Sequence, residues 1–148
     1  MMIREAGEAD LPLLSAIGGG DGSVPWSAGQ FASALSSPPG RVCLLEGGAG
    51  RAAALIVWQT VLDESELHLI ATAPAFRRQG CASRLLDYWF REAAQQGVGR
   101  LLLEVGVSNT AAQSLYRKHG FAANGRRRDY YPLPNGGRED ALLMEKIC

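Results

Sequence analysis

Residues 67–83 read Leu-His-Leu-Ile-Ala-Thr-Ala-Pro-Ala-Phe-Arg-Arg-Gln-Gly-Cys-Ala-Ser, and this stretch decides the fold. Its apolar first part, 67–73, predicts a β-strand. From Ala82 to Ala93, apolar residues recur at helical spacing, which predicts a long amphipathic helix. The polar loop 77–83 therefore connects the end of a strand to the beginning of a helix.

This loop has the properties of an anion-binding site. The first N–H groups of a helix have no partner within the helix and attract anions. Gly80 lets the backbone approach a phosphate closely, Ala82 is nearly as small, and Arg77 and Arg78 add positive charge. The alternative is an ordinary turn, because glycine is common where helices begin. The pattern is neither a Walker loop, since no Gly-Lys-Ser/Thr follows, nor a Rossmann fingerprint, since the three spaced glycines are missing.

Outward from this stretch, the chain alternates between short strands and helices. The expected strands cover 2–6, 41–46, 51–62, 100–107, 121–131 and 140–147, and the other expected helices cover 8–17, the segment from Ser27 to Pro38-Pro39, and 109–119. Ser27 and Gln30 form a capping box. Glycines within 18–22 end the helix expected at 8–17, and Gly47–Gly50 indicates a hairpin turn. This order predicts a single α/β domain that spans residues 1–148.

Composition excludes several classes of protein. Lys plus Arg and Asp plus Glu both number 15, so the chain lacks the net positive charge of nucleic-acid-coating proteins. Cys43, Cys81 and Cys148 form no metal-type cluster with the histidines, and an odd number of thiols suits a reducing compartment. No signal peptide and no apolar run of membrane-spanning length is evident. We therefore expect a cytoplasmic protein that contacts neither nucleic acid nor membrane and needs no metal.

Two polar positions stand out in the second half of the chain. Glu104 lies in the apolar run 101–105, where an ionised carboxylate is costly unless it is paired or faces a cavity. Partial burial disfavours the charged form and suits a general base, whereas an exposed strand end or a structural ion pair is the alternative. Asn109, Ala112 and Tyr116 share one helical face. A tyrosine there often belongs to the core, and Asn109 can serve as an N-cap.

The spacing Arg77-x-x-Gly80-x-Ala82 matches the Q/R-x-x-G-x-G/A motif of the GNAT acetyltransferase superfamily. Over residues 25–144 the chain further resembles the bacterial ribosomal-protein-alanine N-acetyltransferases of the RimI type. The resemblance is carried by Pro25-Trp26-Ser27, Leu62-Asp63-Glu64, Ile70-Ala71, Leu103-Glu104-Val105, Ser108-Asn109, Ala112, Leu115-Tyr116, Gly120-Phe121, Tyr130-Tyr131-Pro132 and Arg138-Glu139-Asp140-Ala141. It implies a fold in which a central mixed, mostly antiparallel sheet is flanked by helices on both faces.

The resemblance also implies roles for individual residues. Glu104 would be the general base of an acetyl transfer and Tyr116 the general acid. The cosubstrate acetyl-coenzyme A would be bound by Ile70, Ala71, Thr72, Arg77, Arg78, Gln79, Gly80, Cys81, Ala82, Ser83, Asn109 and Tyr116. Main-chain N–H groups near Ala71 and Thr72 would stabilise the oxyanion. Glu64, Tyr130 and Tyr131 would bind the acceptor, and Asp63 and Glu66 would line the same side. Packing of the tyrosines and a solvated face for the acids are the alternatives.

Three positions depart from the family pattern, because Gly106 stands in place of the usual Arg, Thr72 in place of Val, and Ala82 where Gly is commoner. The implied acceptor is the N-terminal α-amine of a protein, in particular a ribosomal protein that begins with Ala. The same machinery would also serve lysine side chains or small amines. A non-catalytic acyl-coenzyme A-binding module would need only the loop, so the presence of Glu104 and Tyr116 favours an enzyme. Arg126–Arg128 is expected to form a solvated strand edge.

Overall fold

The computed structural model of this chain describes residues 1–18, 26–37 and 40–148. Its strands are β1 (Met2–Glu5), β2 (Gly40–Glu46), β3 (Ala52–Val61), β4 (Glu64–Thr72), β5 (Arg100–Gly106), β6 (Ala122–Pro132) and β7 (Arg138–Ile147). Its helices are α1 (Leu11–Ile17), α2 (Ala28–Ser36), α3 (Cys81–Gln95) and α4 (Thr110–Lys118), with short 3-10 turns η1 (Glu8–Asp10) and η2 (Pro74–Phe76). Three features of the sequence lie outside the described residues: the glycines at 19–22 and Pro38-Pro39, both expected to end helices, and Pro25, which carries part of the family resemblance.

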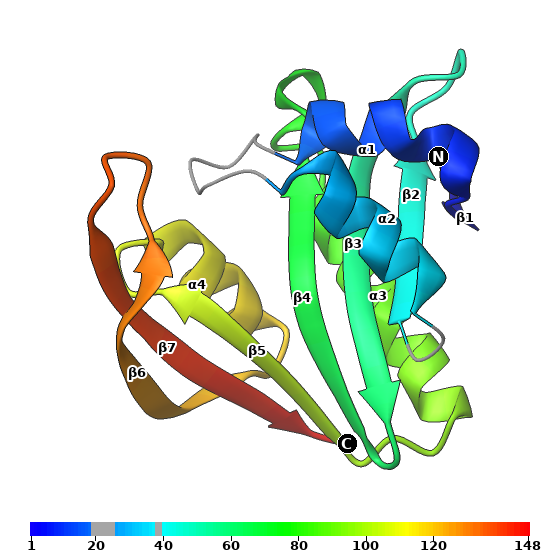
Figure 1. Cartoon of the computed structure of the whole chain (residues 1–148). Coiled ribbons are helices and arrows are strands. Elements are labelled where there is room, and N and C mark those ends of the chain that lie inside the picture. Colours follow the sequence, from blue (N-terminus) through cyan, green and yellow to red (C-terminus); the bar gives the residue numbers. More distant parts are fainter. Residues whose placement is uncertain (19–25, 38–39) are drawn as a thin grey trace.

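The strands form one mixed sheet in the order β1-β2-β3-β4-β5-β7-β6. All neighbours are antiparallel except β4 and β5, which are parallel. Helices α1 and α2 cover one face of the sheet, and α3 and α4 lie behind it (Figure 1). The predicted fold class is therefore confirmed, and the Ser27–Gln30 capping box that begins α2 is also present, with both of its reciprocal hydrogen bonds.

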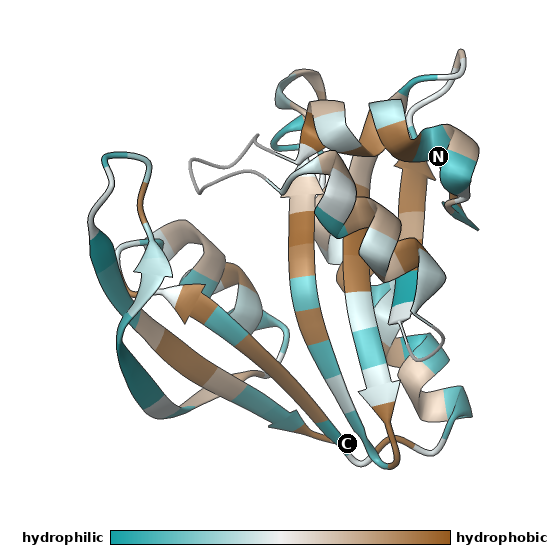
Figure 2. Cartoon of the chain, viewed as in Figure 1, coloured by the Kyte–Doolittle hydropathy of each residue, from teal (hydrophilic) through white to brown (hydrophobic). Residues whose placement is uncertain are grey.

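Two apolar cores hold these layers together. Beneath α3 and α4, the larger core contains Trp58, Leu85 and Trp89, all of which are fully buried. The smaller core lies under α1 and α2 and contains Leu14 and Phe31. Figure 2 shows the consequence in the sheet, where the long central strands carry most of the apolar residues and the β6 edge is largely polar. Burial on both faces explains why β3 reads as an almost continuous apolar run.

Strands β4 and β5 pair only briefly and then separate. Their register covers Glu64–Glu66 against Arg100–Leu102, although β4 continues to Thr72 and β5 to Gly106. Next to this short pairing, the indole N–H of Trp89 donates to Oγ of the buried Ser65 (2.9 Å). Beyond it the two strands diverge, so the sheet opens into the V seen in Figure 1. One edge of β4 is therefore left without a neighbouring strand.

A β-bulge interrupts β4 where this separation begins. Val57 pairs with Leu69 but the next residue, Trp58, pairs with Leu67, so His68 has no partner on β3. Leu67 and Leu69 would point to the same face of a regular strand, but the extra residue between them directs them to opposite faces. Leu67 packs in the larger core with α3, whereas Leu69 packs in the smaller core with α1 and α2. The strand predicted at 67–73 thus begins three residues earlier and contains a bulge that the apolar pattern does not reveal.

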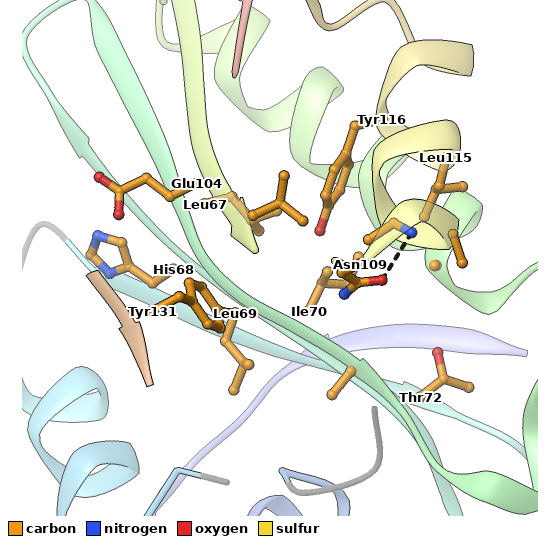
Figure 3. Close-up of a pocket in the computed structure, with 15 residues that line it drawn as sticks. Leu67, His68, Leu69, Ile70, Thr72, Glu104, Asn109, Leu115, Tyr116 and Tyr131 are labelled. Carbon is orange, nitrogen blue, oxygen red and sulfur yellow. Dashed lines mark hydrogen bonds between the residues drawn. The ribbon is translucent and has the colours of Figure 1, made fainter. Parts of the chain in front are cut away.

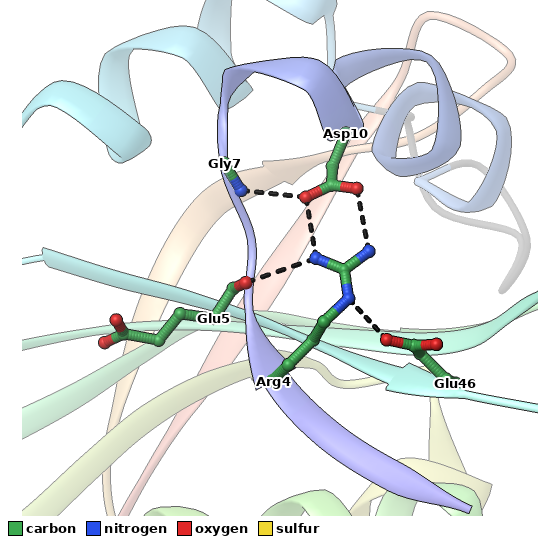
Figure 4. A network of polar contacts seen from close by, with 5 residues as sticks. All are labelled: Arg4, Glu5, Gly7, Asp10 and Glu46. Atoms are coloured by element: carbon green, nitrogen blue, oxygen red, sulfur yellow. Dashed lines mark hydrogen bonds and ion pairs between the residues drawn. The ribbon is translucent and has the colours of Figure 1, made fainter. Parts of the chain in front are cut away.

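An ion-pair network fixes the first helical turn to the edge of the sheet (Figure 4). The guanidinium of Arg4 donates to both carboxylate oxygens of Asp10 (2.9 and 2.8 Å), and its Nε donates to Glu46. The backbone N–H of Gly7 also donates to Asp10 (2.8 Å). These hydrogen bonds, first from Arg4 and then from Gly7, lower the pKa of Asp10 from 3.8 to about 2. Asp10 therefore stabilises the fold in its ionised form.

Replacement of Asp10 by Asn tests this contribution. Because the folded-state pKa is depressed, the stabilisation is fully present above pH 3.8 and is lost as the pH falls toward 2. We expect Asp10→Asn to lower the free energy of unfolding by about 1–2 kcal/mol at pH 7. In urea titrations, the difference between the two proteins should narrow between pH 4 and pH 2. A difference that stays constant over this range would contradict the assignment.

Candidate active site

Two cavities lie where β4 and β5 separate. The first, which we call the strand cavity, has a volume of about 320 Å³ and is lined mainly by β4, β5 and α4. The second, the tyrosine cavity, has a volume of about 570 Å³ and is lined by Trp26, Gln30, Glu66, Leu67, His68, Glu104, Tyr130, Tyr131 and Pro132. Four residues line both cavities, namely Leu67, His68, Glu104 and Tyr131. These four define the junction of the two cavities.

The unpaired edge of β4 forms one wall of the strand cavity (Figure 3). The N–H of Ala73 donates to the carbonyl of Ala53 on β3 (2.8 Å). Because successive residues of a strand direct their main-chain groups to opposite sides, Ala71 also faces β3, while Ile70 and Thr72 face the open side. Of the two N–H groups expected to stabilise the oxyanion, that of Ala71 is directed at β3, whereas that of Thr72 faces the open side together with that of Ile70.

The loop 77–80 leads from η2 into α3, as the sequence predicts. Gly80 is the N-cap and adopts a left-handed conformation (φ 76°), and no side chain of the described residues caps the helix. The first N–H bonded within the helix is that of Arg84, which donates to the carbonyl of Gly80 (3.1 Å). The preceding N–H groups, including those of Ala82 and Ser83, thus remain directed out of the helix end. Ala82 also lines the strand cavity, so this helix end and the cavity adjoin.

The remaining loop side chains differ in what they contact. The Gln79 amide donates to the carbonyl of Ala75 (3.3 Å), and the buried Cys81 thiol donates to the carbonyl of Phe76. Burial raises the pKa of the Cys81 thiol, which suits packing rather than nucleophilic chemistry. Ser83 Oγ lies 3.1 Å from Nε2 of His119, a contact that links the start of α3 to the end of α4. The Arg77 and Arg78 side chains are on exposed residues.

Glu104 lies at the junction of the two cavities and is paired with a cation. One carboxylate oxygen is 3.2 Å from Nη2 of Arg127, and the Glu104 side chain is 24% exposed. The same guanidinium lies over the ring of Tyr130, 4.4 Å from its centroid. The Arg126–Arg128 segment is therefore more than the solvated edge expected from the sequence. Residue order could not show that β6 carries Arg127 across β7 to an acid on β5.

Tyr116 and Asn109 lie on α4, on the opposite side of the strand cavity from β4. Tyr116 is buried and packs edge-on against Phe121, while its hydroxyl points into the cavity (Figure 3). Asn109 is the N-cap of α4, because its Oδ1 accepts from the N–H of Ala112 (3.2 Å). Both residues line the cavity as well. Core packing and capping are thus the means by which these two side chains are held at the cavity wall.

The residues expected to bind the acceptor separate into two groups. Tyr130 and Tyr131 line the tyrosine cavity. Glu64 does not line either cavity, because it lies in the first position of β4 and is paired with Arg100 (3.0 Å). Its predicted role is therefore not supported. Glu66, another of the acids expected on this side, does line the tyrosine cavity, and so does His68.

The carboxylate of Glu139 occupies the space beside Gly106. A Cβ atom at this position would lie too close to Oε1 of Glu139, the flexible end of a side chain, which would then have to move. That carboxylate accepts from the N–H of Ser108 (3.2 Å) and so holds the turn between β5 and α4. The Gln113 amide supports the same turn by donating to the carbonyls of Gly106 and Val107. Glycine at 106 thus lets an acid on β7 fix the loop that positions Asn109.

Within the described residues, no group of three or more His, Cys, Asp or Glu side chains is placed to hold a metal ion. None of the helices in that part of the chain is long and apolar enough to cross a membrane.

Comparison with known proteins shows the family to which this chain belongs. Residues 18–121 match the model of the acetyltransferase (GNAT) family. The chain therefore belongs to the GNAT family, and it is an acetyl-coenzyme A-dependent N-acetyltransferase. The family's acetyl donor is a substrate, and the features that fit it are the uncapped start of α3 and the open edge of β4.

Among its relatives is the [ribosomal protein bS18]-alanine N-acetyltransferase of Escherichia coli strain K12, which is 41% identical over 122 residues, or 82% of this chain and 80% of that protein. The protein of the same name from Haemophilus ducreyi is 38% identical over 121 residues and 82% of each chain. The crystal structure of the ribosomal-protein-S18-alanine N-acetyltransferase from Escherichia coli superposes with a TM-score of 0.90. That alignment has 37% identity and covers 99% of this chain and 92% of the other.

The predicted role of the loop can be tested at Gly80. A methyl group at Gly80 would strain the left-handed backbone and point into open space at the helix end, where a phosphate must approach. We expect Gly80→Ala to weaken acetyl-coenzyme A binding about tenfold by calorimetry, equivalent to about 1.4 kcal/mol.

Gly97 offers a matched control, because it has almost the same backbone conformation (φ 74°), also has open space at Cβ, and lies after α3 rather than before it. Gly97→Ala should lower the melting temperature to a similar extent and leave the affinity unchanged. Equal effects of the two substitutions on affinity would show that the loop does not bind the cosubstrate.

Proposed function

We propose that this chain transfers the acetyl group of acetyl-coenzyme A to the N-terminal α-amine of a protein, and that the acceptor is ribosomal protein bS18. The observation that carries the proposal is the junction of two cavities at Glu104, because an acetyl transfer requires donor and acceptor to meet beside a proton acceptor. The relatives named for acetylation of bS18 support the choice of acceptor, since they align with about four fifths of this chain at 38–41% identity.

The strand cavity is the side assigned to acetyl-coenzyme A. The N–H groups at the start of α3 would bind the pyrophosphate, and Arg77 and Arg78 would add positive charge nearby. Main-chain groups of Ile70 and Thr72 on the open edge of β4 would pair with the extended arm of the cosubstrate, in the manner of an added strand. One of these N–H groups would also face the thioester oxygen and stabilise charge that develops there.

The tyrosine cavity is the side assigned to the acceptor. Tyr130, Tyr131 and Trp26 provide aromatic walls, which restrict the space for the first side chain of a peptide. Glu66 and Glu104 give the cavity two carboxylates. Because Arg127 balances the charge of Glu104, Glu66 is the carboxylate that would attract the ammonium group of a free N-terminus. A short first residue such as Ala would suit a cavity with these aromatic walls and this negative charge.

Glu104 and Tyr116 divide the proton transfers between them. Glu104 accepts a proton from the attacking nitrogen as the N–C bond forms, and Arg127 holds its carboxylate in place. Tyr116, whose hydroxyl points into the strand cavity, donates a proton to the sulfur as the C–S bond breaks. An α-amine suits this machinery better than a lysine side chain does. With pKa values near 8 and 10.4, the neutral form of the lysine amine is roughly two orders of magnitude rarer at pH 7.

Replacement of Glu104 by Gln tests its role as base. The amide keeps the shape of the side chain but accepts a proton far less readily, so kcat should fall about 10²–10⁴-fold. Calorimetry should show nearly unchanged affinity for coenzyme A, because Glu104 lies at the acceptor end of the strand cavity. A variant with wild-type rates between pH 6 and 9 would exclude Glu104 as the base.

The acceptor can be identified with paired peptides and mass spectrometry. One peptide carries the N-terminal sequence of bS18 with a free Ala amine, and its partner has a blocked N-terminus and one internal lysine. We expect acetylation of the first only, because the cavity favours an α-amine next to a small side chain. Fragment masses locate the modification. Acetylation confined to lysine, or to a small polyamine offered in parallel, would overturn the proposed acceptor and leave the acetyltransferase activity intact.

A further inference from the structure

His68 lies at the junction of the two cavities because of the bulge in β4. It is the residue left without a partner on β3, and its side chain lines both cavities. Its Nε2 is 3.5 Å from Oε1 of Glu66, and the side chain is 29% exposed. Figure 3 shows the imidazole at the same end of the strand cavity as the carboxylate of Glu104. A titratable ring therefore stands where the acceptor amine must enter.

The proton balance of the reaction leaves a task for such a group. At pH 7 an α-amine is mostly protonated, so it loses one proton to become a nucleophile and a second as the N–C bond forms. The sulfur gains one proton as the C–S bond breaks, and the net reaction releases one proton to solvent. Glu104 and Tyr116 account for one acceptance and one donation. The proton that leaves the ammonium group first has no acceptor in this pair.

We propose that His68, supported by Glu66, accepts this first proton and passes it to solvent. The inference rests on the proposed function. Nε2 of His68 lies 3.5 Å from Oε1 of Glu66. With a proton on Nε2, the lone pair of Nδ1 is the one that accepts the proton of the ammonium group. The Glu66 carboxylate then stabilises the imidazolium, and the exposed fraction of both side chains gives the proton a route to water. The proton taken later by Glu104 returns to Tyr116 and completes the cycle.

The charged and titratable groups around His68 are consistent with this role. Glu66 on β4 and Glu104 on β5 are the acids that line the tyrosine cavity with it. Arg127 is held at Glu104 (3.2 Å) and balances that charge. Tyr130 and Tyr131 on β6 complete the group, and Tyr116 on α4 faces it across the strand cavity. With Glu104 already paired to a cation, Glu66 is the acid left to support an imidazolium at His68.

The test compares the pH dependence of kcat/KM for wild type and His68→Phe with the Ala-starting peptide. Phenylalanine keeps the aromatic ring but accepts no proton. At pH 6.5 we expect kcat/KM to fall about tenfold, less than for a sole base because water replaces an exposed group in part. At pH 9 the amine is already mostly neutral, so the deficit should shrink below twofold. Glu104→Gln should instead lose activity equally at both pH values.

Two further variants and one spectroscopic measurement separate this role from simple packing. Glu66→Gln should give a smaller loss, about threefold, that also disappears at pH 9. Glu145→Gln removes a carboxylate on β7 that is paired with Arg100 and lines neither cavity, so it should behave as wild type. The chain has two histidines. With coenzyme A bound, adding the peptide should therefore move the imidazole NMR signals of His68 and leave those of His119 in place.

Three results would overturn the role of His68. They are a fall in kcat/KM of His68→Phe that is the same at every pH, a kcat/KM equal to that of wild type at every pH, and His68 NMR signals that do not shift when the peptide is added. In each of these cases wild-type acetylation of the peptide would still support the proposed function. Failure of the wild-type protein to acetylate the peptide would overturn the proposed function, and this inference with it. His68→Gln serves as the second substitution, and it should reproduce the pH-dependent deficit if the phenylalanine variant does not fold.

Discussion

The brief pairing of β4 with β5 is the constraint on which the site depends. After three paired residues on each strand, the strands diverge, and a sheet that would otherwise be continuous gains an internal edge. Main-chain groups of Ile70 and Thr72 are left available on that edge, and α4 provides the opposite wall. A continuous sheet would satisfy these backbone groups internally and would leave no space for a substrate. The strand cavity therefore exists because β4 and β5 form no hydrogen bonds beyond their short paired segment.

The same separation gathers side chains that are distant in sequence. His68 comes from the bulge in β4, Glu104 from β5, Arg127 from β6 and Tyr116 from α4. Glu104 and Arg127 hold each other through an ion pair that crosses β7, which lies between their two strands. These contacts place Glu104, His68 and Tyr116 around the two cavities that we propose to be the sites of the cosubstrate and the acceptor.

Much of the fold could be predicted from local patterns. The capping box at Ser27, the amphipathic face of α3 and the strand-to-helix loop at Gly80 each rest on interactions between residues close in the chain, and the structure contains all three. The candidate site was less predictable. Glu64 was expected near the acceptor but pairs with Arg100, and Ala71 was expected to offer its N–H to the cavity but faces β3. In both cases an offset of one or two residues along a strand changes what a residue faces.

By itself, the sequence determined which segments form strands and helices, that an uncapped helix start follows Gly80, and that the chain resembles a family of acetyltransferases. Periodicity, capping and turn chemistry act over a few residues, so they can be read from residue order. Only the tertiary structure decided that His68 sits on a bulge, that Arg127 reaches Glu104, and that Glu139 occupies the space beside Gly106. These contacts depend on strand register and on the angle between β4 and β5, which are set by packing between residues far apart in the chain.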